Sequence, residues 1–306
     1  MTARVDPRDV AVVVQGAVSA TTAALLADLR RHLLGTRLIL STWEGTDVDA
    51  FDVDDVVLSR DPGAQRCDMF AGGRGPDINC NRMIRSTSAG LAVADRRHVV
   101  KLRTDCTIEH AGVLLCLGEL PPAVGEWRLF ERTIGVSSLY TRHPAKSPLG
   151  LFHPADTVQF GLLDDLRILW DVPFMSDEDA AWFSADRPGA ALADTSPRFY
   201  NEQHVFLAAL GARYRLHVES RVDRRPELVE ASNRALAQNF VVVEPWASGI
   251  RIPRLERHVR WHEEPTSVMT SPMWHRLRQC ATTERRERPD TNTNETRHDR
   301  EESHHG

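Results

Sequence analysis

A strand with charged side chains on one face is the first place where this sequence could do chemistry. Residues 98–105 read His-Val-Val-Lys-Leu-Arg-Thr-Asp. Because successive side chains of a strand point to opposite faces, Lys101, Arg103 and Asp105 are expected to share one face. Charges in an otherwise apolar strand are costly unless they pair or meet a ligand. A structural Arg103–Asp105 ion pair and a ligand site both agree with this pattern.

The strands expected upstream also end in polar groups. Residues 9–16, 37–45 and 55–61 are strand-like, and they end respectively in Gln15-Gly16, in Ser41-Thr42-Trp43-Glu44 and in Asp61. Each ending alone is also consistent with a simple turn, but ligands of open α/β sheets bind at the carboxyl ends of the strands. Four polar ends together predict a ligand site along one edge, where hydroxyls, an indole and a carboxylate could grip a base and a ribose.

The first turns of two expected helices contribute further charged residues to the predicted ligand site. Residues 79–94 read as a helix capped by Asn79 or Asn81, and it places Arg82 and Arg85 on one side. These two arginines could bind a diphosphate, but it is equally consistent with the sequence that they are solvent-exposed residues without a ligand. Glu202 lies in the first turn of a helix expected over 199–210, where the helix dipole favours a carboxylate; a catalytic base is the alternative role.

The order of the expected elements predicts the fold class. Strand, helix, strand, strand, helix and strand over residues 9–105 indicate an α/β fold with a mostly parallel central sheet flanked by helices. A more helical C-terminal part is expected to follow. Its expected elements are a helix at 108–120, a strand at 126–134, a helix at 156–170 with Asp156 as N-cap and Asp164 and Asp165 as surface charges, helices at 199–210 and 228–238, and a strand at 239–244.

Composition excludes several classes of function. The 306 residues are 42% hydrophobic and 26% charged, with a net charge of −5, so no general electrostatic argument favours nucleic acid. No apolar run reaches the roughly 20 residues of a membrane span, and the N-terminus lacks a signal-peptide core. Five cysteines form no CxxC pair. We therefore expect a cytoplasmic protein without an integral membrane segment, for which peripheral contact stays open.

Together these motifs resemble the WavE-type lipopolysaccharide synthesis family, whose members are regarded as glycosyltransferases with a GT-A-like fold. The resemblance covers roughly residues 9–245 and departs at Met83, where the family usually has Gln. The matching residues are Val14-Gln15-Gly16, Ser41-Thr42-Trp43-Glu44-Gly45, Asp61-Pro62-Gly63, Asn79, Asn81-Arg82, Ser86-Thr87, Gly90, Lys101-Leu102-Arg103-Thr104-Asp105, Phe160-Gly161-Leu162, Asp165 and Glu202-Gln203.

The resemblance implies transfer of a sugar from a nucleotide-sugar donor to a hydroxyl of a carbohydrate or glycosylated acceptor. It implies that Asp105 holds Mg²⁺ or Mn²⁺, or that Arg103 and Lys101 share the stabilisation of charge. It implies Glu202 as the base of an inverting transfer, with Asp156 as second candidate. The expected donor-binding residues are Gln15, Gly16, Ser41, Thr42, Trp43, Glu44, Asp61, Asn81, Arg82, Lys101 and Arg103.

The chain is expected to form one domain with two halves, followed by a tail that is charged, rich in Asn and Thr and almost free of aliphatic residues. Residues 1–135 are expected to form a nucleotide-sugar-binding half, residues 136–280 an acceptor-side half of the same domain, and residues 281–306 a disordered tail. A homodimer is compatible with exposed C-terminal tryptophans. The alternatives are a non-catalytic nucleotide-sugar-binding protein and a sugar nucleotidyltransferase, which would normally carry a cation directly after the first strand.

Overall fold

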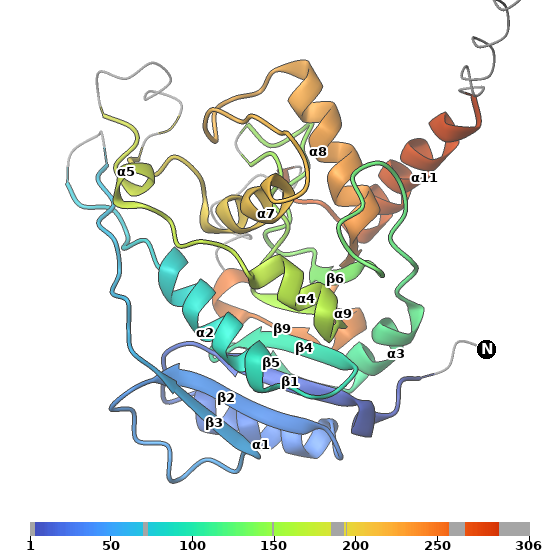
Figure 1. Ribbon diagram of the computed structural model, residues 1–306. Coiled ribbons are helices and arrows are strands. Elements are labelled where there is room, and N and C mark those ends of the chain that lie inside the picture. The colour runs from blue at the N-terminus through green and yellow to red at the C-terminus, as the bar shows by residue number, and fades with distance from the viewer. Residues whose placement is uncertain are drawn as a thin grey trace, which may run out of the picture.

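A mixed seven-stranded sheet lies at the centre of the protein (Figure 1). The computed structural model describes residues 4–69, 73–148, 150–184, 193, 195–256 and 267–287. The sheet order is β3-β2-β1-β4-β7-β6-β8, and β7 alone of these seven runs antiparallel to its neighbours. The expected α/β fold with a mostly parallel sheet is confirmed. The strands are β1 (Val10–Gln15), β2 (Arg37–Trp43), β3 (Asp55–Ser59), β4 (His98–Arg103), β6 (Ile134–Ser137), β7 (Val158–Leu162) and β8 (Phe240–Val243).

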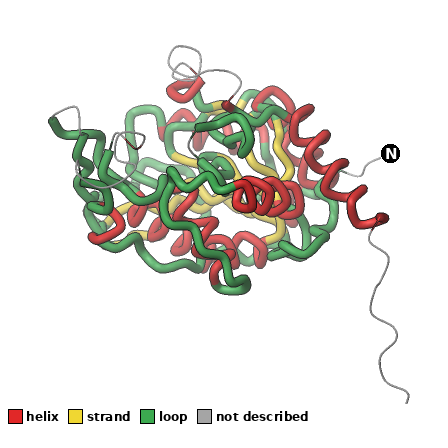
Figure 2. The backbone as a smooth tube through the Cα atoms, turned by 90° about the horizontal axis from the view of Figure 1, so that it is seen from above, coloured by secondary structure: helices red, strands yellow, loops and turns green. Residues whose placement is uncertain are grey.

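Helices cover both faces of the sheet, and those of the C-terminal part gather on one of them. One face carries α1 (Thr22–His32) and α3 (Gly112–Glu119). The other carries α2 (Cys80–Val93), α4 (Leu163–Trp170), α7 (Asn201–Gly211), α8 (Pro226–Asn239) and α11 (Ser271–Glu287). Seen from above in Figure 2, helices and loops cover much of the sheet. The shorter elements are η1 (Pro7–Asp9), α5 (Asp177–Ala180), α9 (Pro245–Ser248) and the small sheet of β5 (Thr107–Ile108) and β9 (Ile250–Arg251).

The alternation of side chains explains why β1 and β4 differ in composition. Every residue of β1 is buried, because Ala11 and Val13 pack on the α2 side while the other valines pack on the α1 side. In β4, Val100 and Leu102 belong to the cluster on the α1 side. Lys101 and Arg103 therefore face the side of α2 and α4, as the period of two predicts.

The helix expected over residues 156–170 is wrong in its first half. Residues 158–162 form β7 instead, and the helix α4 begins only at Leu163. All five strand residues are buried, since β7 pairs with β4 on one side and with β6 on the other. The expectation was wrong because Phe160 of β7 and the leucines of α4 follow one another at helical spacing in the sequence. Asp156 therefore precedes a strand and caps no helix.

The strand expected over residues 126–134 is also wrong, because β6 begins at Ile134. Buried side chains accept hydrogen bonds from the backbone N–H groups of this segment. Gln238 Oε1 accepts from Trp127 at 2.8 Å, and Asn239 Oδ1 accepts from Leu129 at 2.7 Å. Asp165 is only 2% exposed and accepts from the N–H groups of residues 131 and 132 at 2.7 and 3.0 Å. Asp165 is thus a buried structural acceptor and no surface charge.

The remaining expected elements lie close to their predicted bounds, with α3 shorter at both ends than the helix expected over 108–120. The helix α11 continues to Glu287, which places residues 281–287 of the expected disordered tail in a helix. Residues 288–306 lie outside the described residues. Strands from residues 10–103 and from residues 134–243 share the one central sheet.

The close packing of α2 on the sheet generates a stability prediction. A Cβ at Gly90 would collide with Val13 Cγ1 and lie 3.2 Å from Ser41 Cβ, so Gly90→Ala pushes α2 away from β1 and β2. We expect a loss of about 1–3 kcal/mol in the free energy of unfolding, measured by denaturant titration. Gly211→Ala is the matched control, because a Cβ at this residue of α7 meets nothing within 4 Å. Equal stability of the two variants would contradict this packing.

Candidate functional site

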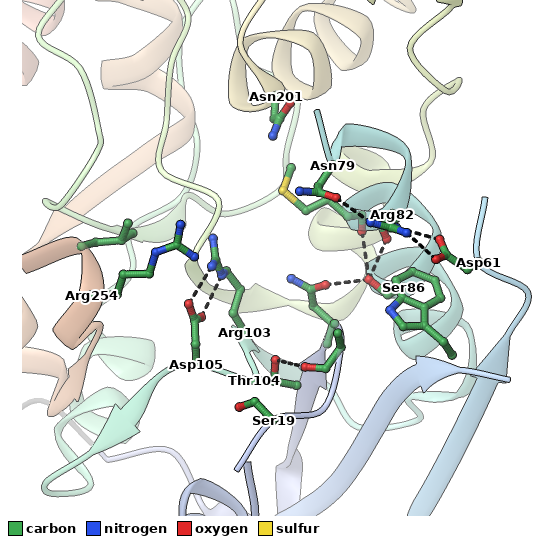
Figure 3. Close-up of a pocket in the computed structure, with 16 residues that line it drawn as sticks. Ser19, Asp61, Asn79, Arg82, Ser86, Arg103, Thr104, Asp105, Asn201 and Arg254 are labelled. Atoms are coloured by element: carbon green, nitrogen blue, oxygen red, sulfur yellow. Dashed lines mark hydrogen bonds and ion pairs between the residues drawn. The ribbon is translucent and has the colours of Figure 1, made fainter. Parts of the chain in front are cut away.

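A cleft of about 600 Å³ opens at the carboxyl ends of the parallel strands (Figure 3). The chain leaves β1 toward β2 on one side, while β4 pairs with β1 on the other side. The connections of an open α/β sheet diverge at such a point and leave a crevice, which is where ligands bind. The cleft brings together seven of the residues that the sequence predicted: Gln15, Gly16, Trp43, Asp61, Arg82, Arg103 and Asp105.

Hydrogen bonds from α2 hold the floor of the cleft. Ser86 of α2 places its hydroxyl 2.6 Å from Gln15 Oε1 at the end of β1. The hydroxyl of Ser41, in β2, donates to the Ser86 carbonyl oxygen at 2.7 Å. Gln15 and Ser41 are buried, and both side chains face α2 because they are partners in the parallel register of the two strands. The polar strand ends are therefore fixed before any ligand arrives.

An ion pair forms one wall of the cleft. Arg82 Nε and one terminal nitrogen donate to the two carboxylate oxygens of Asp61 at 2.8 and 2.6 Å. The Arg82 guanidinium is the main cause that holds the pKa of Asp61 below its usual range. Asp61 also accepts from the backbone N–H of Gly63 at 2.9 Å. This wall therefore offers ligands a balanced pair of charges.

A second ion pair lies across the cleft, beside a cation without a partner. Arg103 donates to both oxygens of Asp105 at 2.9 and 2.7 Å. Burial alone would lower the pKa of Arg103, but the carboxylates of Asp105 and Asp156 outweigh this and raise it. Arg254 points into the same end of the cleft (Figure 3). In the described part of the chain, no hydrogen-bond acceptor or carboxylate meets the Arg254 side chain, so it is the cleft's uncompensated positive charge.

Lys101 is buried beneath the cleft and does not line it. Its side chain is fully buried, its Nζ donates to the backbone carbonyl of Asp156, and the same atom lies 4.5 Å from the ring centroid of Trp170. Burial lowers the pKa of Lys101 to about 8, and the negative charge of Asp156 opposes this effect. The ammonium thus fastens β4 to the segment that leads into β7.

Glu202 and Asp156, the two residues expected to serve as base, lie close enough for the charge of Asp156 to act on the Glu202 carboxyl group. Asp156 is 3% exposed, and its Oδ2 receives no N–H or O–H donor from the described residues. The Glu202 side chain is 15% exposed and directly follows Asn201, which lines the cleft. Burial, reinforced by the charge of Asp156, raises the pKa of Glu202 to about 8. Burial and the neighbouring carboxylate therefore both favour the protonated form of Glu202.

A neutral histidine completes the surroundings of this pair. His153 Nε2 lies 3.5 Å from Glu202 Oε2, and burial lowers the pKa of His153 to about 3. The imidazole therefore stays uncharged at neutral pH and adds no positive charge that would favour ionised Glu202. His153 also packs edge-on against Tyr200 with ring centroids 5.7 Å apart.

Five residues expected to bind the donor lie outside the lining of the cleft. Ser41 and Thr42 are fully buried in β2, and Glu44 is exposed beyond its end. Asn81 exchanges two hydrogen bonds with the backbone of Met175, at 3.1 and 2.7 Å, and so anchors α2 to the segment before α5. Lys101, the fifth, occupies the buried position described above.

Sequence reasoning missed several residues that line the cleft, and Asn201 and Arg254 are the two that matter most for its chemistry. Asn201 begins α7, one position before Glu202, and its place next to a suspected base was a usable signal. Arg254 follows β9 in the stretch Ile-Arg-Ile-Pro-Arg, which carries no pattern of its own. Arg254 reaches the cleft because the small sheet of β5 and β9 ties its segment to the residues after β4.

The carboxylates of the cleft fit a divalent metal poorly as they stand. Both oxygens of Asp105 accept from Arg103, and both oxygens of Asp61 accept from Arg82. Within the described ranges, no three His, Cys, Asp or Glu side chains come together as a group that could hold a metal ion. A metal on Asp105 would have to displace a guanidinium, so the metal site stays a prediction.

The raised pKa of Glu202 generates a prediction about stability. Because burial raises the pKa of Glu202 from its ordinary value of 4.5 to about 8, stability falls as pH rises from 4.5 to 8: over this range the folded state retains a proton that the unfolded state releases. Glu202→Gln removes this linkage and resembles the protonated acid. We expect the melting temperature of the variant to exceed that of the wild type at pH 8, and the difference to shrink at pH 4.5.

The matched control for that comparison is Glu227→Gln. Glu227 occupies the same position in the first turn of α8, but its side chain is 66% exposed. Its substitution should leave the pH dependence of the melting temperature unchanged. A Glu202→Gln variant that tracks the wild type at every pH would contradict the buried protonated pair.

Comparison with known proteins places this fold and this cleft in a family. A comparison with curated proteins finds no match to the chain. Among the described residues, no helix combines the length and the apolar character that crossing a membrane requires. The model of the family described as WavE lipopolysaccharide synthesis matches residues 10–295, which include the whole central sheet and every residue of the cleft. The chain therefore belongs to the WavE lipopolysaccharide synthesis family, and its role lies in lipopolysaccharide biosynthesis.

Proposed function

We propose that the protein is a glycosyltransferase, which moves a sugar from a nucleotide-sugar donor to a hydroxyl group of a glycan acceptor during lipopolysaccharide synthesis. The observation that carries the proposal is a polar cleft at the point where the strand connections diverge, with the largely buried carboxyl groups of Glu202 and Asp156 next to Asn201, which lines it. Burial and the nearby charge of Asp156 raise the pKa of Glu202, which suits this carboxyl group to act as a base for a hydroxyl proton.

The size and lining of the cleft suit the nucleoside diphosphate part of a donor. About 600 Å³ lies within the range of pockets that hold small molecules. Trp43 is half-buried and lines the cleft, which suits it to stacking against a base. Gln15 and Ser86 supply fixed polar groups nearby, and Arg254 supplies a positive charge without a partner among the described residues. Guanidinium groups match the geometry of phosphate oxygens.

The reaction then follows from these groups. Glu202, in its ionised form, takes the proton of the acceptor hydroxyl as the oxygen attacks the anomeric carbon. The bond from this carbon to the phosphate oxygen breaks, and the nucleoside diphosphate leaves with the electron pair. Arg103 and Arg254 stabilise the negative charge that develops on the phosphate. The negative charge of Asp156 keeps Glu202 a stronger base, because it favours the protonated form of the neighbouring carboxyl group. A base in this role belongs to an inverting transfer.

Arginines carry the neutralisation of charge in this proposal, and a metal on Asp105 is the alternative. Mg²⁺ binds proteins through one or two carboxylates together with substrate phosphates, so Asp105 alone would suffice if a donor drew Arg103 away. The metal would then supply Lewis-acid stabilisation of the leaving diphosphate. Turnover that persists after exhaustive chelation would favour Arg103 and Arg254.

The role of Glu202 predicts how turnover depends on pH. Release of nucleoside diphosphate from a panel of nucleotide sugars is measured with acceptor glycans, and with water as the fallback acceptor. The rate for wild type should rise as pH increases through about 8, because Glu202 must lose its proton to act as base. Glu202→Gln should lower the rate by about 10² or more and remove the rise with pH.

Two comparisons make this test decisive. Glu227→Gln should leave the rate and its pH profile unchanged, because this residue is exposed on α8. The affinity for donor should survive in Glu202→Gln, since the substitution keeps the shape of the side chain. Equal losses of rate and affinity would demote Glu202 to a binding residue, and unchanged turnover would refute its role as base.

A further inference from the structure

A second concave surface adjoins the cleft on the far side of Asp61. It encloses about 490 Å³ and is lined by Ser59, Arg60, Asp61, Pro62 and Arg85, which we call the Arg60–Arg85 surface. Asp61 lines both this surface and the cleft, so the two adjoin each other at this residue.

The Arg60–Arg85 surface carries a positive charge that the protein does not neutralise. Its single carboxylate, Asp61, is already held through both oxygens by Arg82. In the part of the chain that the structure describes, no carboxylate and no hydrogen-bond acceptor meets the guanidinium of Arg60 or of Arg85. Two sets of N–H donors thus face a shared concavity without partners, in a protein whose net charge is −5.

An aromatic ring orders one of these arginines while leaving its donors free. The Arg85 guanidinium lies 5.2 Å from the ring centroid of Phe174, a cation–π arrangement that occupies none of its N–H groups. Phe174 is 39% exposed, so part of its ring is open to solvent beside Arg85. The exposed part of the ring offers an apolar surface next to the cationic one.

We infer that the Arg60–Arg85 surface is an acceptor subsite that recognises a phosphate group on a saccharide. Arginine forms paired hydrogen bonds to phosphate oxygens, and two guanidiniums match the double charge of a phosphate monoester. The exposed ring of Phe174 suits the apolar face of the attached sugar. The assignment to an acceptor rests on the proposed function, because it assumes that the neighbouring cleft holds the donor.

The test uses glucose 6-phosphate as the probe of the full-length protein. Binding is followed through the arginine Nε–H signals in ¹H–¹⁵N spectra, which Arg60→Gln and Arg85→Gln assign. The titration is repeated with the cleft saturated by whichever of UDP, GDP and TDP binds best. Glucose and inorganic phosphate serve as comparison ligands. Arg213→Gln is the matched control, since Arg213 lies 5.8 Å from the ring centroid of Tyr214 in a different concave surface.

The inference predicts that glucose 6-phosphate shifts the Arg60 and Arg85 signals whether or not nucleotide is present. Each single variant should weaken its binding about threefold, and the double variant about tenfold. Arg213→Gln should leave the affinity unchanged, and glucose should not bind. Inorganic phosphate should bind more weakly than glucose 6-phosphate, because it lacks the sugar.

Other results would overturn the inference in distinguishable ways. If nucleotide displaces glucose 6-phosphate, the probe binds in the donor cleft and not at the Arg60–Arg85 surface. If glucose 6-phosphate does not bind, or if Arg213→Gln weakens its binding as much as the Arg60 and Arg85 variants do, there is no phosphate subsite at this surface. If inorganic phosphate binds as tightly as glucose 6-phosphate, the surface does not recognise the saccharide, and the inference fails in that part. If glucose 6-phosphate binds as predicted but no nucleotide binds at all, the phosphate subsite stands, whereas its acceptor role and the proposed function both fail.

Discussion

The burial of one ammonium group organises the candidate site. Lys101 has no exposed surface, and a buried cation must find partners within the protein. It meets this need with the Asp156 carbonyl oxygen and the Trp170 ring, and so joins β4, the segment before β7 and α4. This bond helps to fix the position of Asp156, whose charge acts on Glu202 in the first turn of α7. A strand in the first half of the chain thereby influences a carboxyl more than a hundred residues away.

The charges around the cleft divide into those that cancel and those that remain. Arg82 with Asp61 and Arg103 with Asp105 are close pairs, so each guanidinium is largely balanced in the empty cleft, although both still line it and can turn to a phosphate. Arg254 remains as positive charge within the cleft. Burial, by contrast, retains a proton on Glu202. A cation directed at an incoming anion and a nearby group that can accept a proton are the two elements that transfer of a sugar from a diphosphate requires.

The sequence predicted the parts of the site that depend on local pattern. The alternation in His98–Asp105 placed Lys101 and Arg103 on one face, and the polar strand ends located Gln15, Trp43 and Asp61 on one cleft, because parallel strands share one edge. It failed where tertiary contacts replace local preference. Residues 158–162 form a central strand because β4 and β6 offer partners on both sides, although their spacing with α4 reads as helical.

Other parts of the site lay beyond any local pattern. The backbone donors of residues 127–132 are satisfied by side chains that follow in α4 and α8, and by no neighbouring strand. Arg254 reaches the cleft through the pairing of two-residue strands that no periodicity reveals. Asp156 and Glu202 lie in segments that are far apart in the sequence, so the effect of one carboxyl group on the pKa of the other follows only from the folded structure.

The measurement that tests the central claim most directly is a thermal-shift panel of UDP-, GDP-, TDP- and CMP-linked sugars, with and without Mn²⁺, on wild type and on Arg254→Gln. A ligand that binds only the folded state raises the melting temperature. The proposal predicts that one nucleotide class stabilises the wild type, that stabilisation persists without Mn²⁺, and that Arg254→Gln reduces it. Stabilisation that requires Mn²⁺ would return the neutralising role to a metal on Asp105. No shift with any nucleotide sugar in either condition would contradict the assignment of this cleft to a donor.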